Sequence, residues 1–167
     1  MRPTADKVRK SIFDMLQGEV EGKSVLDLFS GTGALGFEAL SGGARQVTFI
    51  ESDKDQARKI KENIQKLGVE RQSTVWPADA LKAVQDLSAQ GRQFDLIFLD
   101  PPYAGGWGQK TLAALARASL AGKNTLIFFE CDKKERSEEV IGRLRRIKQK
   151  KHGGTCLHIY RAEEENV

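Results

Sequence analysis

Short apolar runs alternate with amphipathic segments along most of the chain. Apolar runs bounded by turn residues are typical of buried strands. Such runs occur at residues 24–29, 46–50, 73–76, 94–99 and 125–130. Between them, apolar positions spaced three or four residues apart predict helices. These helices are expected at residues 33–40, 54–67, 80–87, 109–120 and 134–144.

Both ends of the chain depart from this alternation. Residues 4–17 have an amphipathic pattern that predicts an additional helix before the first strand. Residues 145–151 and 155–161 flank a pair of glycines, which predicts two antiparallel strands joined by a tight turn. We therefore expect the regular order of strands and helices to end in a hairpin.

Alternating strands and helices predict a parallel sheet with helices on both faces. Together with the hairpin, they indicate an α/β, Rossmann-like fold with a mostly parallel sheet of seven strands and an antiparallel C-terminal hairpin. A length of 167 residues suits one domain. We expect an N-terminal helical segment at residues 1–20 and a Rossmann-like core at residues 21–167.

The composition narrows the class of protein. No apolar run is long enough to span a bilayer, and residues 1–10 lack the apolar centre of a signal peptide, so we expect a cytoplasmic protein. Two cysteines, Cys131 and Cys156, form no zinc-binding pattern, so we expect reduced thiols and no metal site. The net charge of +4 and the basic runs at residues 2–10 and 143–151 favour a polyanionic partner.

A glycine-rich loop with G-x-G-x-x-G spacing begins at Gly31, between the first strand and the first helix. With Glu51 twenty residues further on, this loop is compatible with a nicotinamide dinucleotide. Asp27 argues against that ligand, because a carboxylate four residues before Gly31 would repel a pyrophosphate and attract a cationic amino group. S-adenosyl-L-methionine carries such an amino group, so the loop favours this cofactor.

Two further carboxylates follow the second and third predicted strands. Glu51 is placed to accept hydrogen bonds from ribose hydroxyls, and Asp79 to accept one from an adenine amino group while also capping a helix. Open α/β sheets bind ligands at the carboxyl ends of their strands, so we expect these side chains to share one crevice. The predicted cofactor-binding residues are Asp27, Phe29, Gly31, Gly33, Glu51, Ser52, Asp79, Ala80 and Asp100.

The fourth predicted strand ends in Asp100, Pro101, Pro102 and Tyr103, which we predict to be the catalytic residues. Proline has no backbone N–H, so this loop is rich in acceptors and poor in donors. The Asp100 side chain and the Pro101 carbonyl can hold the hydrogens of an exocyclic amino group and stabilise the positive charge that develops on its nitrogen. Tyr103 offers an aromatic face on which the target base can stack.

In combination, these motifs resemble the bacterial 16S ribosomal RNA guanine-N2 methyltransferases, a family of class I, DPPY-type amino methyltransferases. The resemblance covers nearly the whole chain and is strongest at residues 2–9, 27–36, 38–40, 49–51 and 94–103. It implies a Rossmann-like class I methyltransferase fold, S-adenosyl-L-methionine as cofactor and no metal. The implied reaction is methylation of the N2 amino group of a guanine in 16S ribosomal RNA.

The resemblance also implies a partner and the residues that contact this partner at the mouth of the site. The partner would be 16S ribosomal RNA within an assembled or assembling small ribosomal subunit, and the enzyme is expected to act as a monomer. Arg2, Thr4, Arg9 and Tyr103 are predicted to contact the RNA.

Three other functions are compatible with parts of this pattern. Adenine-N6 in DNA or RNA also presents an amino group to a D-P-P-Y loop, although 167 residues leave no room for a separate DNA-recognition domain. A nicotinamide-dependent oxidoreductase shares the glycine spacing. A non-catalytic RNA-binding module could keep the fold without activity, which the intact loop at Asp100 argues against.

Overall fold

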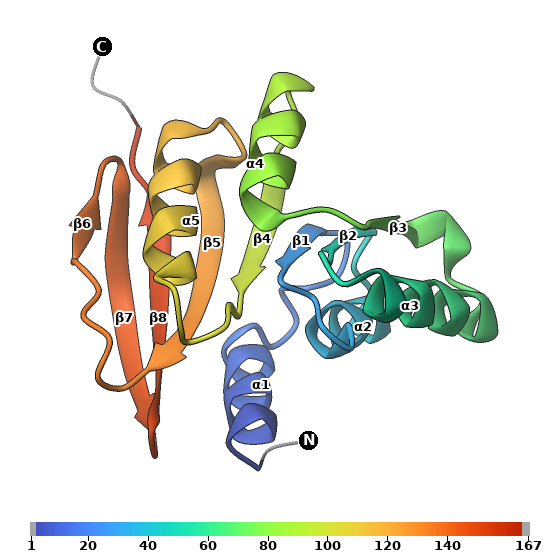
Figure 1. The fold of residues 1–167 in the computed structure, drawn as a ribbon, viewed down its shortest axis with the longest axis horizontal. Helices are drawn as coiled ribbons and strands as arrows, with labels where there is room; N and C mark the ends of the chain where they lie inside the picture. The colour runs from blue at the N-terminus through green and yellow to red at the C-terminus, as the bar shows by residue number, and fades with distance from the viewer. Residues whose placement is uncertain (1–2, 165–167) are drawn as a thin grey trace.

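The computed structural model describes residues 3–164 of the chain, without the side chains of Pro3 and Thr4. Its centre is an eight-stranded sheet with the order β3-β2-β1-β4-β5-β8-β7-β6 (Figure 1). The five parallel strands are β1 (Ser24–Leu28), β2 (Gln46–Ile50), β3 (Ser73–Trp76), β4 (Phe94–Leu99) and β5 (Ala121–Asp132). The antiparallel strands are β6 (Val140–Ile141), β7 (Leu144–His152) and β8 (Thr155–Ala162).

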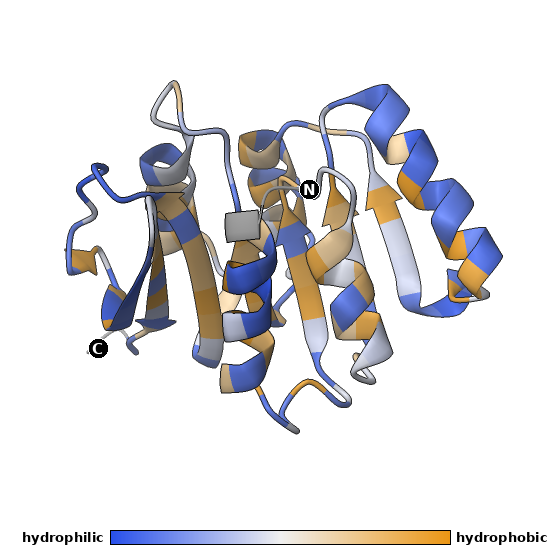
Figure 2. Cartoon of the chain, turned by 90° about the horizontal axis from the view of Figure 1, so that it is seen from below, coloured by the Kyte–Doolittle hydropathy of each residue, from blue (hydrophilic) through white to orange (hydrophobic). Residues whose placement is uncertain are grey.

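Helices cover both faces of the sheet, as the alternation predicted. They are α1 (Pro3–Met15), α2 (Ala34–Ser41), α3 (Lys54–Leu67), α4 (Ala80–Ala89) and α5 (Trp107–Arg117), with a short 3-10 helix at Glu70–Gln72. The apolar residues of α1, α2 and α3 share one buried core with one face of the sheet, and those of α4 and α5 share a second core with the other face. In Figure 2 the strands are mostly hydrophobic, and the outward faces of α1 and α3 are hydrophilic.

The predicted N-terminal helix is present as α1 and packs on the sheet. Val8, Ile12 and Leu16 are buried in the core that α1 shares with α2 and α3. The ring of Phe13 lies 5.8 Å from the ring of Phe98 on β4. The start of α1 lies beside the carboxyl ends of the central strands, because Ala5 lines two cavities there together with Phe29 and Asp100. No helix in residues 3–164 combines the length and apolar character needed to cross a membrane.

The helix predicted at residues 134–144 is wrong. This segment is a turn and loop followed by the short strand β6, so the sheet has eight strands and not seven. The Arg146 guanidinium donates to the carbonyl of Ser137 at 3.1 Å, and the Tyr160 hydroxyl donates to the carbonyl of Glu138 at 2.8 Å. Gly142, with φ of 56°, allows the tight turn from β6 into β7.

Hydrogen bonds from residues of β7 and β8 thus override the local helix propensity of this charged segment.

The two neighbouring boundaries also differ from the prediction. The helix predicted at residues 109–120 is α5, which ends at Arg117. The strand predicted at residues 125–130 is β5, which begins earlier, at Ala121 opposite Phe94.

Candidate active site

The loops that follow β1 and β4 lie side by side at one edge of the sheet. The two strands are parallel neighbours, with Asp27 opposite Phe98 and Leu28 opposite Leu99. The chain therefore leaves both strands at the same level, and the glycine loop and the proline loop meet there (Figure 1). This is the edge at which open α/β sheets bind ligands.

The glycine loop is tied to the end of β2 by Glu51. One carboxylate oxygen, Oε1, accepts the backbone N–H of Gly31 at 2.8 Å, and the other, Oε2, accepts that of Asp53 at 2.8 Å. The backbone N–H of Ser30 donates to the carbonyl of Ile50 at 2.8 Å. Gly31 has φ of 58°, and a Cβ atom there would meet nothing within 4 Å, so the loop leaves open space beside its backbone.

Asp27 is a buried carboxylate beneath this loop, 1% exposed. Its Oδ2 accepts the backbone N–H of Gly36 at 3.1 Å. Burial raises the pKa of Asp27 to about 8, and the negative charges of Asp100 and Glu51 act in the same direction. A cationic group in contact with Asp27 would offset both effects, so the site is suited to a ligand with an ammonium group.

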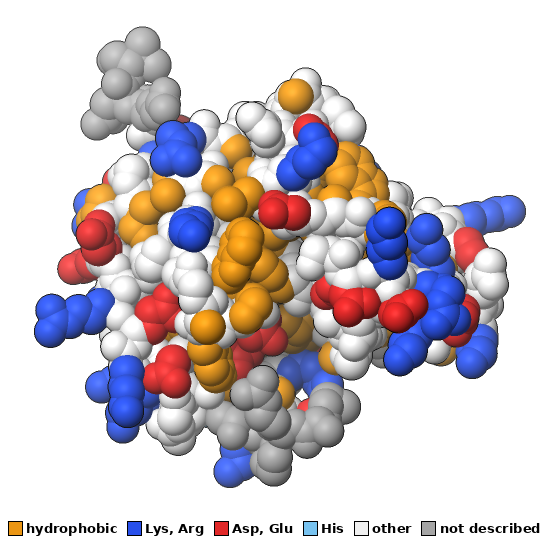
Figure 3. Space-filling model, in the orientation of Figure 1, with side chains coloured by type: hydrophobic (Ala, Val, Ile, Leu, Met, Phe, Trp, Pro, Cys, Tyr) orange, Lys and Arg blue, Asp and Glu red, His pale blue; other side chains and the backbone are white. Residues whose placement is uncertain are grey.

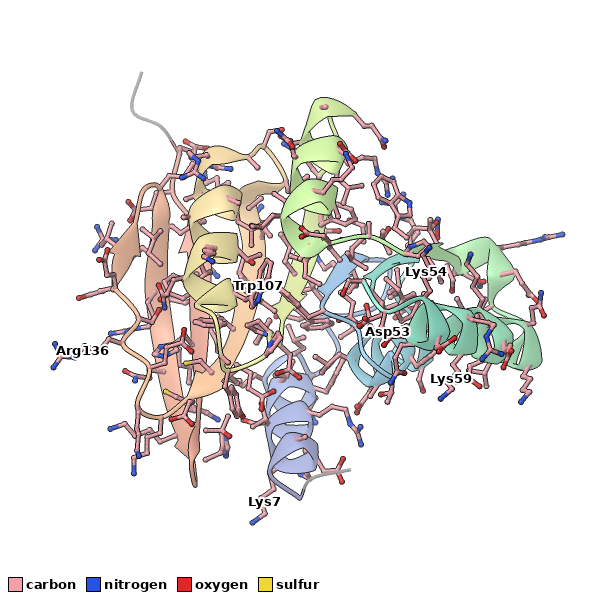
Figure 4. The ribbon with its side chains drawn as sticks, in the orientation of Figure 1. Lys7, Asp53, Lys54, Lys59, Trp107 and Arg136 are labelled. Carbon is pink, nitrogen blue, oxygen red and sulfur yellow. The ribbon has the colours of Figure 1, made fainter. Side chains whose placement is uncertain are left out.

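Three adjoining cavities of about 520, 230 and 210 Å³ surround the two loops. Phe29 lines all three and has φ of 58°, the one left-handed backbone conformation at a non-glycine residue in the described part of the chain. Its ring meets the ring of Trp107, at the start of α5, edge to face at 6.4 Å, and Figure 4 labels Trp107 beside the central strands. Phe29 therefore stands at the junction of the cavities.

The proline loop forms one wall of the largest cavity. Asp100, Pro101, Pro102 and Tyr103 all line it, and Asp100 also lines the 230 Å³ cavity with Asp27 and Gly31. Tyr103 is 43% exposed, and its hydroxyl lies 3.4 Å from the hydroxyl of Thr155 on β8. The ring is therefore fixed at one end and accessible from the solvent.

Most of the predicted site residues come together at these cavities. Glu51 and Ser52 line the 520 and 210 Å³ cavities, and Asp79 and Ala80 line the 210 Å³ cavity. Asp79 also caps α4, where it accepts the backbone N–H of Lys82 at 3.0 Å. Figure 3 shows the hollow between the elements, with acidic side chains inside it.

The remaining predicted residues differ in how they relate to these cavities. Gly33 lines none of the three cavities, although its neighbours Thr32 and Ala34 line the 230 Å³ cavity. Glycine is required there because φ is 83° and a Cβ atom would be 2.8 Å from the ring of Phe37. Arg9 lines the 230 Å³ cavity and forms ion pairs with Asp6 at 3.1 Å and Glu38 at 3.0 Å. Arg2 and the side chain of Thr4, predicted to contact RNA, lie outside the described residues.

Sequence reasoning missed the wall formed by β5, β8 and the first turn of α5. Glu130, Asp132, Gly154 and Thr155 line the largest cavity, and Trp107 lines the 210 Å³ cavity. The signal for the two acidic residues was available, because they end the fifth parallel strand as Glu51 ends the second. The contribution of Thr155 depends on the pairing of β8 with β5, which local sequence does not indicate.

The buried histidine is structural. His158 stacks on Phe129 with ring centres 5.9 Å apart, and burial together with the charge of Arg146 lowers its pKa to about 4. Among residues 3–164, no group of three or more His, Cys, Asp or Glu side chains is arranged to hold a metal ion. Both cysteines are buried and free.

The sheet order, the glycine loop after β1 and the carboxylates at the strand ends define a Rossmann-like class I methyltransferase domain. The family model described as Conserved hypothetical protein 95 matches residues 1–161, and the chain belongs to this family.

Named relatives and a solved structure agree with this assignment. The chain is 36% identical to ribosomal RNA small subunit methyltransferase D of Haemophilus influenzae over 134 residues, which cover 80% of this chain and 69% of that protein. It is 28% identical to the protein of the same name from Escherichia coli K12, covering 99% and 81% of the two chains. The crystal structure of HI0767 from Haemophilus influenzae matches with a TM-score of 0.85 at 31% identity, covering 97% of this chain and 100% of that chain.

Proposed function

We propose that this protein transfers a methyl group from S-adenosyl-L-methionine to the N2 amino group of a guanine in 16S ribosomal RNA. The observation that carries the proposal is the meeting of two loops: the glycine loop above the buried carboxylate of Asp27 and the acceptor-rich loop at Asp100 line one cavity. Relatives named ribosomal RNA small subunit methyltransferase D supply the substrate class.

The cofactor fits the residues around the glycine loop. Asp27 is buried, carries a raised pKa and would accept the cationic amino group of the methionine end. Each oxygen of Glu51 accepts one backbone N–H and keeps a lone pair for a ribose hydroxyl. Asp79 and Ala80 line the cavity on the far side of Glu51 and would hold the adenine. When bound, the cofactor supplies a methyl group already activated by a sulfonium.

The protein's own task is to position the amine and stabilise its charge. The nitrogen of an exocyclic amino group is a weak nucleophile, because its lone pair is delocalised into the ring. Hydrogen bonds from its two hydrogens to the carboxylate of Asp100 and the carbonyl of Pro101 favour a tetrahedral nitrogen. Transfer would form the C–N bond and break the C–S bond of the bound cofactor, and Asp100 would take the proton that the nitrogen then loses. Tyr103 stacks on the base and holds it in line.

Basic side chains are present on the turn after β5 and on α1, two segments that border this cavity. Lys133 and Lys134 are exposed in the turn that follows the cavity residue Asp132, and the backbone N–H of Lys133 donates to the carbonyl of Gly154 at 2.8 Å. In Figure 4, Lys7 on α1 and Arg136 after β5 both point outward. Such cations suit the phosphates of an RNA whose target base enters the cavity.

Mass spectrometry of nucleosides tests the proposal. The protein is incubated with labelled S-adenosyl-L-methionine and unmodified small-subunit particles, with naked 16S RNA in parallel. We expect N2-methylguanosine in wild-type samples and none with D100A, while D100A still binds S-adenosylhomocysteine. Labelled N6-methyladenosine, or binding of NADH and not of S-adenosylhomocysteine, would overturn it. Comparison of the two substrates, together with sedimentation of the enzyme, also tests our proposals of a subunit substrate and a monomeric enzyme.

A further inference from the structure

Glu130 is a buried carboxylate in the wall of the cavity, without a role in the reaction described above. It lies near the end of β5, and the residue is 8% exposed. It lines both the 520 Å³ cavity, with the proline loop and Tyr103, and the 230 Å³ cavity, with Asp27 and Gly31. Glu130 therefore borders both the cavity proposed for the target base and the cavity proposed for the methionine end of the methyl donor.

The register of the sheet places Glu130 beside Asp100. Leu99 on β4 is opposite Phe129 on β5, so the next residues along the two strands, Asp100 and Glu130, stand at one level. Neighbouring strands are about 4.8 Å apart, which sets the spacing of the two backbones. On β1, the residue at this same level is Phe29, because Leu28 is opposite Leu99, and Phe29 lines all three cavities.

The two carboxylates also leave the sheet on the same face. Side chains alternate along a strand, so Glu130 follows the side of Phe128, and Asp100 follows the side of Phe98. Both phenylalanines belong to the core beneath α1, α2 and α3, with ring centres 5.9 Å apart. Asp100 and Glu130 thus present two neighbouring acceptor groups to one ligand edge.

We propose that Glu130 selects guanine by accepting the hydrogen bond of its ring N1–H, while Asp100 holds the adjacent 2-amino group. This inference rests on the proposed function and adds the residue that reads the base. Guanine presents two neighbouring donors, the ring N1–H and the 2-amino group. In adenine and cytosine, the ring nitrogen next to the amino group is an acceptor, which would face the carboxylate of Glu130 with no hydrogen between them. A site built to pair a donor rejects analogues that lack it, because its buried acceptor is left unsatisfied.

The first experiment separates recognition of the base from binding of the cofactor. E130Q keeps the size of the side chain and removes its charge, and E130D keeps the charge. We expect methyl transfer to small-subunit particles to fall about 10- to 100-fold in E130Q, with partial recovery in E130D. S-Adenosylhomocysteine affinity, measured by calorimetry, should stay within about threefold of wild type, which also shows that the variant is folded.

A matched control lies five residues further along the chain. Glu135 is half-buried in the turn after β5 and lines none of the three cavities around the loops. E135Q makes the same chemical change, and transfer should stay within about twofold of wild type. A loss of S-adenosylhomocysteine affinity in E130Q that matches its loss of transfer would overturn the inference and assign Glu130 to the cofactor.

The second experiment uses an RNA in which 2-aminopurine replaces the guanine that the wild-type enzyme methylates. This base keeps the 2-amino group but has an acceptor at N1. The wild type should prefer guanine over 2-aminopurine by about 10-fold or more, and E130Q should lose most of that preference, because its amide can donate to N1. An unchanged preference in E130Q would overturn the inference while leaving the proposed function intact. Failure of the wild type to produce N2-methylguanosine would instead remove the proposed function.

Discussion

The backbone N–H of Gly31 donates to Oε1 of Glu51 at 2.8 Å, and this bond joins the glycine loop to the strand beside it. Because the other oxygen of Glu51 accepts from the N–H of Asp53 at 2.8 Å, one carboxylate fixes both loops that border the cofactor cavity. The same side chain therefore shapes the loop and remains available to a ribose.

Replacement of Glu51 should weaken binding of the cofactor more than it destabilises the fold. E51A removes two charge-assisted hydrogen bonds to the backbone and the proposed contacts with the ribose hydroxyls. We expect the Kd for S-adenosylhomocysteine to rise about 10- to 100-fold, measured by calorimetry. E62A, on the exposed side of α3, is the control and should bind like wild type. Equal affinities of E51A and wild type would contradict the assigned role.

The raised pKa of Asp27 predicts that the affinity for S-adenosylhomocysteine depends on pH. With a pKa of about 8, Asp27 is mostly protonated in the free protein at pH 7, and contact with the ammonium group of the ligand favours the carboxylate. Binding of S-adenosylhomocysteine at pH 7 should therefore release about one proton, and affinity should rise as the pH increases from about 6 to 8. Calorimetry in buffers of different ionisation enthalpy measures this release, which should disappear in D27N.

The same group predicts how the free protein responds to pH. The folded-state pKa of Asp27 lies above its ordinary value of 3.8, so the protonated form is favoured by folding. Its contribution to stability is present below the ordinary value and is lost as the pH rises through about 8. Relative to wild type, the Tm of ligand-free D27N should therefore increase between about pH 4 and 8. A difference in Tm that stays constant over this range would show that Asp27 is ionised throughout.

Replacement of Gly36 by alanine should lower the free energy of unfolding for a steric reason. A Cβ atom there would lie 2.2 Å from Cε1 of Phe49, so α2 approaches β2 too closely for alanine. Alanine gains about 1 kcal/mol of helix propensity, but overpacking a core costs about 1–3 kcal/mol and should dominate. Urea unfolding of G36A should show this loss. G154A, where a Cβ atom meets nothing within 4 Å, should unfold like wild type.

The exposed lysines beside the cavity predict a salt-dependent effect on RNA. The double variant K133Q/K134Q should bind 16S RNA more weakly, and the slope of log affinity against log salt should decrease by about 1 for each phosphate that the variant no longer neutralises. K59Q/K61Q removes the same charge from the exposed side of α3 (Figure 4) and should leave the slope unchanged. Equal salt-dependence slopes in the two double variants would show that the RNA phosphates do not contact Lys133 and Lys134.

The sequence predicted the parts of the fold that local patterns determine. The parallel strands, the helix at residues 54–67 and the loops at Asp27 and Asp100 follow from apolar spacing and from glycine and proline positions. The segment after β5 was predicted incorrectly, because its conformation depends on bonds from Arg146 and Tyr160, which come from strands later in the chain. The acidic wall at Glu130 was missed because this residue belongs to no motif, and only its place at the end of a parallel strand indicates that it borders the site.

The backbone of Phe29 shows why the two halves of the site are not independent. A φ of 58° is unfavourable for a residue with a side chain, and a glycine would adopt it at no cost. A glycine would, however, remove the ring that meets Trp107, at the residue that lines all three cavities. Phe29 is thus a wall residue of all three cavities. A substitution of Phe29 that changes which base is accepted will therefore also change the shape of the cavities proposed to hold the methyl donor.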